Sequence, residues 1–329
     1  MPTPRIVSIA VALVIAGVIG GAPAAAQQAG RAVAVTFDDL PGITQGDRSV
    51  AGHARITEAL LRRIAEHRVP AIGFVNEDKL RTDGRVDPRR VDLLRRWTSA
   101  GLELGNHAYS HMDLHANPVE AFIADVARGD SVTRLVLADA GTRPRFFRHP
   151  FLHTGRTPED RRRFETWLAE RGYRVAPVTI DNSDYIFAAA YDLAPADSLR
   201  RVADEYIRYM EATAEYYEQQ SRALFGREIA QVLLLHANNL NADHFGRLAE
   251  MYARRGYVFV PLEQALRDPA YASEDTYTGP AGITWIHRWA LTQGKRGAFF
   301  AGEPEVPAWV TDLARPQENP RMQQQPPGR

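Results

Sequence analysis

Short runs of aliphatic and β-branched residues alternate along the chain with longer amphipathic stretches. The runs predict seven strands, at residues 32–37, 71–75, 102–105, 145–147, 174–180, 230–235 and 257–261. The amphipathic stretches predict helices near residues 49–67, 88–100, 118–139, 158–171, 196–225 and 242–255. Because parallel neighbours need crossover connections, this alternation predicts an α/β fold around a parallel sheet, either a barrel or an open doubly wound sheet.

The first 26 residues predict a secretory signal peptide. Arg5 precedes an apolar run over residues 6–20, and small residues follow, ending in Ala24-Ala25-Ala26 with cleavage expected after Ala26. The run is short for a bilayer core of about 30 Å, so a cleaved signal is favoured over an uncleaved anchor. We therefore expect an exported protein, periplasmic or secreted, with no stable membrane anchor after cleavage.

The regular alternation of predicted strands and helices stops after residue 268. Residues 31–268 are expected to form one catalytic domain and residues 269–314 a C-terminal extension that packs on it. Trp285 and Trp289, four residues apart in the extension, are read as packing residues, with a sugar contact as the alternative. The same reading applies to Tyr206, Tyr209, Tyr216 and Tyr217. Residues 315–329 are polar and proline-rich, and are predicted to be a disordered tail.

Composition narrows the chemistry of this 329-residue chain. Its residues are 24% charged and 45% hydrophobic, a composition that excludes intrinsic disorder of the whole chain. Its formal net charge of +0 gives no excess of positive charge for binding nucleic acid. It contains no cysteine, so thiolate metal sites, cysteine nucleophiles and a lipid anchor on cysteine are excluded. Lys79 and Lys295 are the only lysines, and neither sits in a catalytic motif. Any metal site must use His, Asp and Glu.

Carboxylates and histidines follow two of the predicted strands. Asp38 and Asp39 end the first strand, although a solvated turn before Pro41 would also explain them. His107 and His111 follow the strand at 102–105, and their spacing predicts two imidazoles on one face of a helical turn, suited to a shared metal. His115 is read as a surface histidine one turn further on.

Three more strands end in ionisable groups. Arg148 follows the strand at 145–147, Asp181 and Asp184 follow that at 174–180, and His236 follows the apolar strand at 230–235. A structural histidine would also explain His236 in isolation. Ligands of parallel α/β sheets bind at the carboxyl ends of strands, and all these candidates lie there. Together they predict one site at that edge.

The ordered set of motifs resembles a known family. Thr-Phe-Asp-Asp at 36–39, His-x-x-x-His at 107–111, Arg-x-Pro-Phe at 148–151, Asp-x-x-Asp-Tyr at 181–185 and Leu-Leu-Leu-His at 233–236 resemble the five motifs of the NodB-homology polysaccharide deacetylases, carbohydrate esterase family 4. The resemblance covers residues 31–268. It implies a distorted (β/α)7 barrel, which agrees with the seven predicted strands, and a hydrolase of acetylated polysaccharide.

The resemblance also implies a role for each matched residue. Asp39, His107 and His111 would bind a divalent metal, most often Zn²⁺, with Co²⁺ or others possible; two histidines and one carboxylate leave a position open for water. Asp38 would be the general base that deprotonates the metal-bound water. His236 would be the general acid. Arg148 would pair with Asp38, and Asp184 would align His236. The backbone N–H of Phe151 would contact the oxyanion. Tyr185 and Leu234 would form the walls of the pocket for the acetyl methyl.

Two positions depart from the family pattern. Ala108 stands where Ser or Thr is frequent, and Tyr185 stands where Trp is common, which leaves the substrate class open between N-acetyl groups of peptidoglycan or chitin-type sugars and O-acetyl groups of xylan. The alternatives are a same-fold hydrolase of another C–N bond, of the cyclic amide or imide type, and a non-catalytic carbohydrate-binding relative. Loss of Asp38, His236 or a metal ligand would indicate the latter, and all are present.

Overall fold

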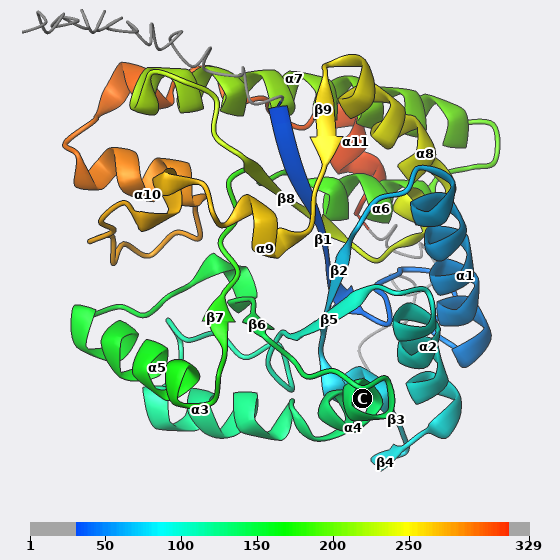
Figure 1. The fold of residues 1–329 in the computed structure, drawn as a ribbon. Coiled ribbons are helices and arrows are strands. Elements are labelled where there is room, and N and C mark those ends of the chain that lie inside the picture. The colour runs from blue at the N-terminus through cyan, green and yellow to red at the C-terminus, as the bar shows by residue number, and fades with distance from the viewer. Residues whose placement is uncertain (1–30, 316–329) are drawn as a thin grey trace, which may run out of the picture.

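A curled parallel sheet forms the centre of the protein in the computed structural model, which describes residues 31–315 (Figure 1). The sheet order is β7-β6-β5-β2-β1-β8, and β9 pairs with the first residues of β1. Its strands are β1 (Arg31–Leu40), β2 (Ile72–Val75), β5 (Glu103–Asn106), β6 (Phe146–Phe147), β7 (Arg174–Val175), β8 (Gln231–His236) and β9 (Tyr257–Phe259). All seven predicted strands are confirmed, and every pairing among them is parallel.

The sheet closes into a barrel through an irregular segment after β7. Thr179 and Ile180 both donate their backbone N–H groups to the carbonyl of Val232 at 3.0 Å, and Ile180 forms a parallel bridge with Leu233 of β8. The predicted strand over residues 174–180 is therefore regular only at its start. Pro177 explains the break, because proline has no N–H for a sheet ladder. The result is a distorted (β/α)7-type barrel, which confirms the fold that the family resemblance implies.

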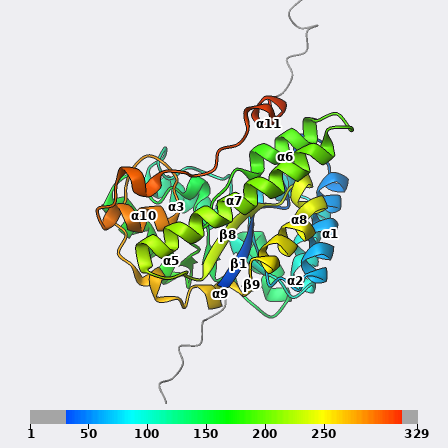
Figure 2. The same cartoon turned by 90° about the horizontal axis from the view of Figure 1, so that it is seen from above.

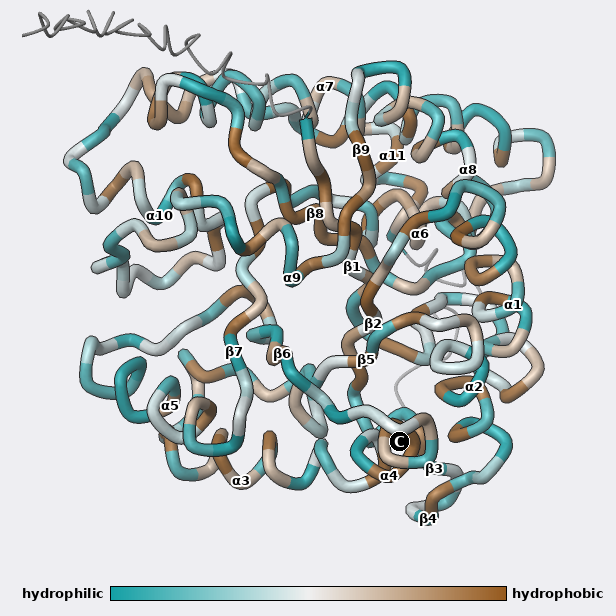
Figure 3. Tube along the Cα trace, viewed as in Figure 1, coloured by the Kyte–Doolittle hydropathy of each residue, from teal (hydrophilic) through white to brown (hydrophobic). Residues whose placement is uncertain are grey.

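Helices surround the barrel, as the view from above shows (Figure 2). They are α1 (Val50–Glu66), α2 (Pro88–Ser99), α3 (Val119–Arg128), α4 (Ser131–Asp139), α5 (Pro158–Glu170), α6 (Asp184–Leu193), α7 (Leu199–Phe225) and α8 (Asn239–Arg254). Apolar residues concentrate along the central strands and polar ones along the outer helices (Figure 3). This distribution follows from burial of both faces of a parallel sheet, which makes strands such as β1 and β8 almost wholly apolar up to their ends.

Two helix predictions need correction. The single helix predicted over residues 118–139 is wrong, because α3 and α4 are separate helices. At Gly129, between them, a Cβ atom would lie 2.6 Å from the backbone nitrogen of Tyr109, so this junction must be a glycine for the chain to pass so closely. Helix α6 was not predicted, because its first residue, Asp184, reads as the end of a strand.

Short elements complete the fold. They are η1 (Glu77–Leu80), the hairpin of β3 (Arg81–Thr82) and β4 (Arg85–Val86), η2 (Pro150–Leu152), α9 (Leu262–Ala265), η3 (Pro269–Ala272), α10 (Trp285–Thr292), η4 (Gly297–Phe300) and α11 (Ala308–Leu313). Trp289 is 1% exposed, and its ring contacts those of Phe225 and Tyr271. Trp285 and the four tyrosines of α7 are also buried, which confirms their packing role.

The predicted signal peptide lies outside the described residues, as does the predicted tail apart from Arg315. No helix within residues 31–315 combines the length and the apolarity that a bilayer crossing needs.

Candidate active site

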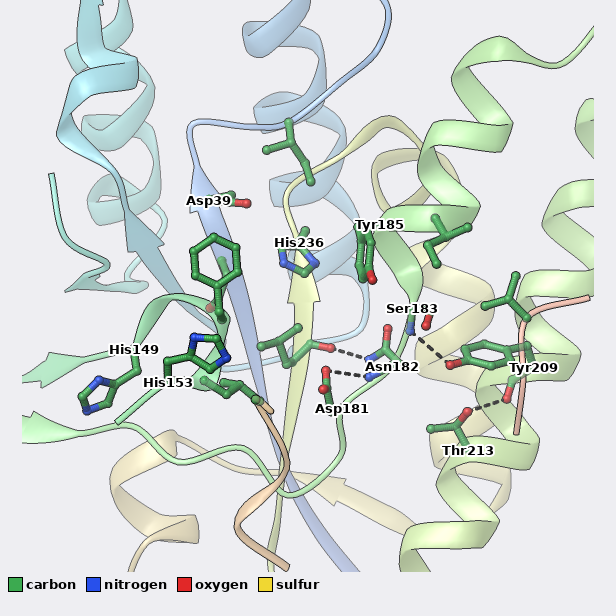
Figure 4. Close-up of a pocket in the computed structure, with 18 of the residues that line it drawn as sticks. Asp39, His149, His153, Asp181, Asn182, Ser183, Tyr185, Tyr209, Thr213 and His236 are labelled. Atoms are coloured by element: carbon green, nitrogen blue, oxygen red, sulfur yellow. Dashed lines mark hydrogen bonds between the residues drawn. The ribbon is translucent and has the colours of Figure 1, made fainter. Parts of the chain in front are cut away.

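A cavity of about 930 Å³ opens at the carboxyl ends of the central strands (Figure 4). Eight of the ten predicted site residues line it: Asp38, Asp39, His107, His111, Phe151, Tyr185, Leu234 and His236. The other two, Arg148 and Asp184, are each 0% exposed and lie behind the lining residues that they contact. The structure therefore brings all ten residues to one place.

Asp39, His107 and His111 form a potential metal site. Their ligand atoms all lie within 4.8 Å of one another. His107 donates from Nδ1 to the carbonyl of Arg148 at 2.8 Å, which directs its Nε2 toward the carboxylates. Burial lowers the pKa of His107 to about 4, and burial together with the neighbouring His107 lowers that of His111 to about 4. Both rings are consequently neutral near pH 7, the form that binds a metal.

The two histidines do not lie on a helical turn, which corrects the sequence-based prediction. The segment after β5 is a loop, and both Ala108 (φ 63°) and His111 (φ 56°) have left-handed backbone conformations. These two positive φ values fold the loop back so that the imidazole ring centroids of His107 and His111 lie 4.8 Å apart. The side chains meet as predicted, but through a different backbone path.

Three polar residues that were not predicted as site residues form hydrogen bonds to the loop that carries His107 and His111. Asp125 of α3 accepts hydrogen bonds from the backbone N–H groups of Tyr109 and Ser110 at 3.0 and 3.1 Å, and from the Ser110 hydroxyl at 2.8 Å. Asn76 donates to the carbonyl of His107 at 2.6 Å. Asn106 accepts from the Ala108 N–H at 2.8 Å. Such contacts fix a ligand loop before a metal binds.

Asp38 is paired with a buried arginine. Arg148 Nη1 lies 3.3 and 3.2 Å from the two carboxylate oxygens of Asp38, and its Nη2 and Nε donate to Thr36 Oγ1 and the Ala176 carbonyl. Burial raises the pKa of Asp38 above its usual value of 3.8, and the positive charge of Arg148 opposes that rise. The raised pKa makes this carboxylate more basic than one in water, as a general base requires, and the ion pair with Arg148 favours its ionised form.

His236 has the opposite electrostatic setting. Its Nδ1 lies 2.6 Å from Asp184 Oδ1, and its backbone N–H donates to Asp184 Oδ2 at 2.8 Å. Burial disfavours the charged imidazolium, but the charge and hydrogen bond of Asp184, together with the charges of Asp39 and Asp38, raise the pKa of His236 to about 9. Asp184 is itself fixed by the side-chain amide of Asn241 at 2.7 Å. His236 is thus protonated at neutral pH and can donate a proton.

Lys79 contacts the candidate metal ligand Asp39, a relationship that no pattern in the sequence indicates. Its ammonium lies 2.9 Å from Asp39 Oδ1 and 3.4 Å from the Asp39 carbonyl oxygen. Burial would raise the pKa of Asp39, but Lys79 and the nearby histidines hold it well below its usual range.

The walls of the cavity come from separate parts of the chain. Phe151 and Tyr185, both large aromatics about half exposed, line it. Gly282 packs so closely on η2 that a Cβ atom would lie 1.8 Å from the Phe151 carbonyl oxygen. Residues Glu303–Val306 form another wall, so the C-terminal extension contributes directly to the cavity.

Asp181 and the other histidines after the strand ends lie in or near the cavity. Asp181 lines the cavity, and burial raises its pKa to about 6. His115 is not on the surface as predicted: it is 6% exposed and its ring stacks on that of His153 at 4.0 Å. His153 in turn binds Asp113 at 2.7 Å. His149 is enclosed by the rings of Phe122, Phe147 and Phe164.

Comparisons with known proteins agree with this arrangement. The model of the family "Polysaccharide deacetylase" matches residues 25–163, which include Asp38, Asp39, His107, His111 and Arg148. No curated protein sequence matches the chain.

The chain also aligns with solved structures from three Bacillus species, each with a TM-score under 0.5. A CE4 family pseudoenzyme from Bacillus anthracis is 13% identical, with 73% of this chain and 66% of that chain covered and a TM-score of 0.48. The polysaccharide deacetylase of Bacillus cereus is 18% identical, with coverage of 70% and 91% and a TM-score of 0.47. A peptidoglycan deacetylase of Bacillus subtilis is 19% identical, with coverage of 73% and 92% and a TM-score of 0.47.

The family match spans the strand ends that carry the predicted base, the predicted metal ligands and the arginine behind them. Residues 25–163 therefore match the polysaccharide deacetylase family, and this match supports a hydrolase of that type.

Proposed function

We propose that this protein is a metal-dependent deacetylase that removes N- or O-linked acetyl groups from a polysaccharide outside the cytoplasm. One observation carries the proposal. A buried carboxylate paired with Arg148 and an imidazole paired with Asp184 flank the cluster of Asp39, His107 and His111. A base, an acid and a metal-ligand set within one cavity are what hydrolysis of an amide or ester needs.

The donor set fits a catalytic divalent metal, for which we propose zinc, with cobalt as an alternative. Two neutral imidazoles and one carboxylate are three protein ligands, the number that leaves a position open for substrate or water. When bound there, the metal would polarise the acetyl carbonyl and lower the pKa of a water molecule.

The protein groups then supply the proton transfers. Asp38 accepts a proton from the attacking water as the water oxygen bonds to the acetyl carbonyl carbon. His236 donates its proton to the leaving nitrogen or oxygen as the bond from that atom to the acetyl carbon breaks. Acetate and the free amine or hydroxyl are released. The backbone N–H of Phe151 is our proposed donor to the developing oxyanion.

The cavity walls fit a sugar substrate. Phe151 and Tyr185 both line the cavity and are 53% and 51% exposed, so their rings are accessible to a substrate. Aromatic faces of this kind stack on the apolar faces of sugar rings. Leu234, 5% exposed, also lines the cavity, and we propose that it contacts the acetyl methyl.

Export follows from the predicted signal peptide, and a polysaccharide of the cell envelope or the surroundings would then be within reach of the enzyme. We propose cleavage after Ala26. Mass spectrometry of protein secreted from a host that processes such signals tests this: a mature N-terminus at Gln27 supports it, and retention of Met1 in exported protein contradicts it.

Acetate release tests the activity itself. The zinc-reconstituted protein would be assayed on peptidoglycan, chito-oligosaccharides and acetylxylan, beside Asp38→Asn as the matched control. We expect release from at least one substrate, and a loss of about 10²–10⁴-fold or more in the variant with zinc still bound. Full activity of Asp38→Asn would refute its role as base. Failure on all three substrates, combined with hydrolysis of a cyclic amide, would replace the proposed substrate class.

A further inference from the structure

The contact between Lys79 and Asp39 involves the oxygen that faces the metal-ligand cluster. Asp39 Oδ1 is the oxygen that lies 4.0 Å from His111 Nε2, and the same atom is 2.9 Å from the Lys79 ammonium. The side chains of Lys79 and Asp39 are only 24% and 12% exposed, so solvent screens their interaction incompletely. A metal held by Asp39 through this oxygen would therefore share it with a second cation.

Lys79 is carried by an element that is fixed on several sides. In η1, Glu77 is 2% exposed and accepts hydrogen bonds from the backbone N–H groups of Val132 and Thr133 at 2.8 and 2.6 Å, which caps helix α4. Asp78 donates its N–H to the Tyr109 carbonyl at 3.1 Å, within the loop that carries the metal-ligating histidines. The position of Lys79 opposite Asp39 is thus built into the fold.

The residue type is also informative. Only two of the 40 basic residues of the chain are lysines. Within residues 31–315, the other side chains that form ion pairs with carboxylates are arginines and histidines. An arginine would hold a carboxylate with two parallel hydrogen bonds in a planar fork. A lysine ammonium is a single compact charge on a flexible stem, which can turn away when another cation arrives.

We propose that Lys79 is a resident counter-cation of the metal site, which neutralises Asp39 in the metal-free protein and weakens the binding of the metal. This inference rests on the metal site of the proposed function. Like charges on one carboxylate oxygen repel, so each cation lowers the affinity of the other. Metal occupancy then depends on the free metal concentration around the exported protein, while the metal-free form keeps its buried carboxylate paired.

The test compares Lys79→Met with the wild type and with Lys295→Met as a matched control. Methionine keeps the apolar stem and removes the charge, and Lys295 is an exposed lysine in the C-terminal extension, away from the cavity lining. Zinc affinity would be measured by competition with a chromophoric chelator, and the thermal midpoint of unfolding would be measured in EDTA. Lys79→Gln is a second variant that keeps a polar group at this position.

We expect Lys79→Met and Lys79→Gln to bind zinc about tenfold more tightly or better, and to unfold at a lower temperature in EDTA. A merely structural lysine would not change the two properties in opposite directions. Lys295→Met should match the wild type in both. If the wild type binds zinc and both Lys79 variants bind it equally or more weakly, the inference about Lys79 is overturned while the proposed metal site stands. Absence of zinc binding by wild type and variants alike would overturn the proposed metal site and this inference with it.

Discussion

Asp38 and His236 are register partners on the adjacent parallel strands β1 and β8. The candidate base and the candidate acid therefore leave the sheet at the same level and enter the same cavity. Each is held by a different buried partner of opposite charge, Arg148 behind Asp38 and Asp184 behind His236. Strand pairing fixes the spacing of the two groups. Arg148 favours the ionised form of Asp38, and Asp184 favours the protonated form of His236.

The Asp184–His236 pair predicts the alkaline limb of the pH–rate profile. Against the effect of burial, Asp184 with smaller contributions from Asp39 and Asp38 raises the pKa of His236 to about 9, so His236 is protonated at neutral pH and loses its proton as the pH rises through that pKa. Asp184→Asn removes the negative charge. We therefore expect the alkaline limb of kcat/KM to move to lower pH by about one unit or more, where one unit corresponds to about 1.4 kcal/mol. The profile of acetate release between pH 5 and 10 measures this shift.

Asp192→Asn is a suitable control for that experiment. Asp192 binds Thr44 and Asn239 in the same half of the protein but does not contact His236. Its substitution should leave the alkaline limb in place. An unchanged limb in Asp184→Asn would show that another group controls the alkaline side and would remove His236 as the acid.

The buried Asp38–Arg148 pair predicts a large stability effect that a second substitution partly reverses. Arg148→Met leaves the Asp38 carboxylate, 1% exposed, without its counter-charge, so we expect a loss of about 3–5 kcal/mol in the free energy of unfolding. In Asp38→Asn/Arg148→Met no buried charge remains unpaired at this point. The double variant should therefore be more stable than Arg148→Met alone.

Chemical denaturation of wild type, both single variants and the double variant completes the cycle. Additive effects of the two substitutions would mean that the ion pair contributes no coupling. In that case Arg148 would stabilise the protein only through its bonds to Thr36 and the Ala176 carbonyl.

Site residues at the ends of strands were predictable from the sequence. Site residues brought in by tertiary contacts between distant segments were not. Asp38 and His236 could be placed together because parallel strands end at one edge of a sheet. Lys79 could not be connected with Asp39, 40 residues earlier, because no local pattern relates an η1 side chain to a strand end. The wall formed by residues 303–306 depends on how the extension packs, which periodicity does not specify.

The loop that carries His107 and His111 also depends on tertiary contacts that the sequence pattern does not reveal. The spacing of His107 and His111 predicts proximity on a helical turn, and proximity is observed. The backbone conformation differs because Ala108 and His111 adopt positive φ, which non-glycine residues tolerate only when neighbouring contacts enforce it. Those contacts come from Asp125 and Asn76, which are distant in sequence from one another.

Asp125 therefore has a predicted effect on metal affinity. Asp125→Ala removes three hydrogen bonds to Tyr109 and Ser110 while leaving every ligand atom in place. We expect zinc to bind about 10–100-fold more weakly, because the ligand loop loses its support. Chelator competition measures the affinity. Asp139→Ala, an exposed position at the end of α4, is the control, and equal zinc affinity in Asp125→Ala and wild type would contradict the support role.

Gly282 links the C-terminal extension to the catalytic cavity and can be tested by adding one methyl group. In Gly282→Ala the new Cβ would lie 1.8 Å from the Phe151 carbonyl oxygen, so the backbone that carries Phe151 must shift. If Phe151 supplies the oxyanion N–H and a sugar-stacking ring, as proposed, kcat/KM should fall by about 10²-fold, since loss of one such donor costs 10²–10³-fold. Gly246→Ala in helix α8, where the new atom would meet only side chains of Arg63 and His67, should retain wild-type activity. Wild-type kcat/KM in Gly282→Ala, with the fold intact by circular dichroism, would mean that the position of Phe151 is not critical, and the oxyanion contact would then have to come from the metal site alone.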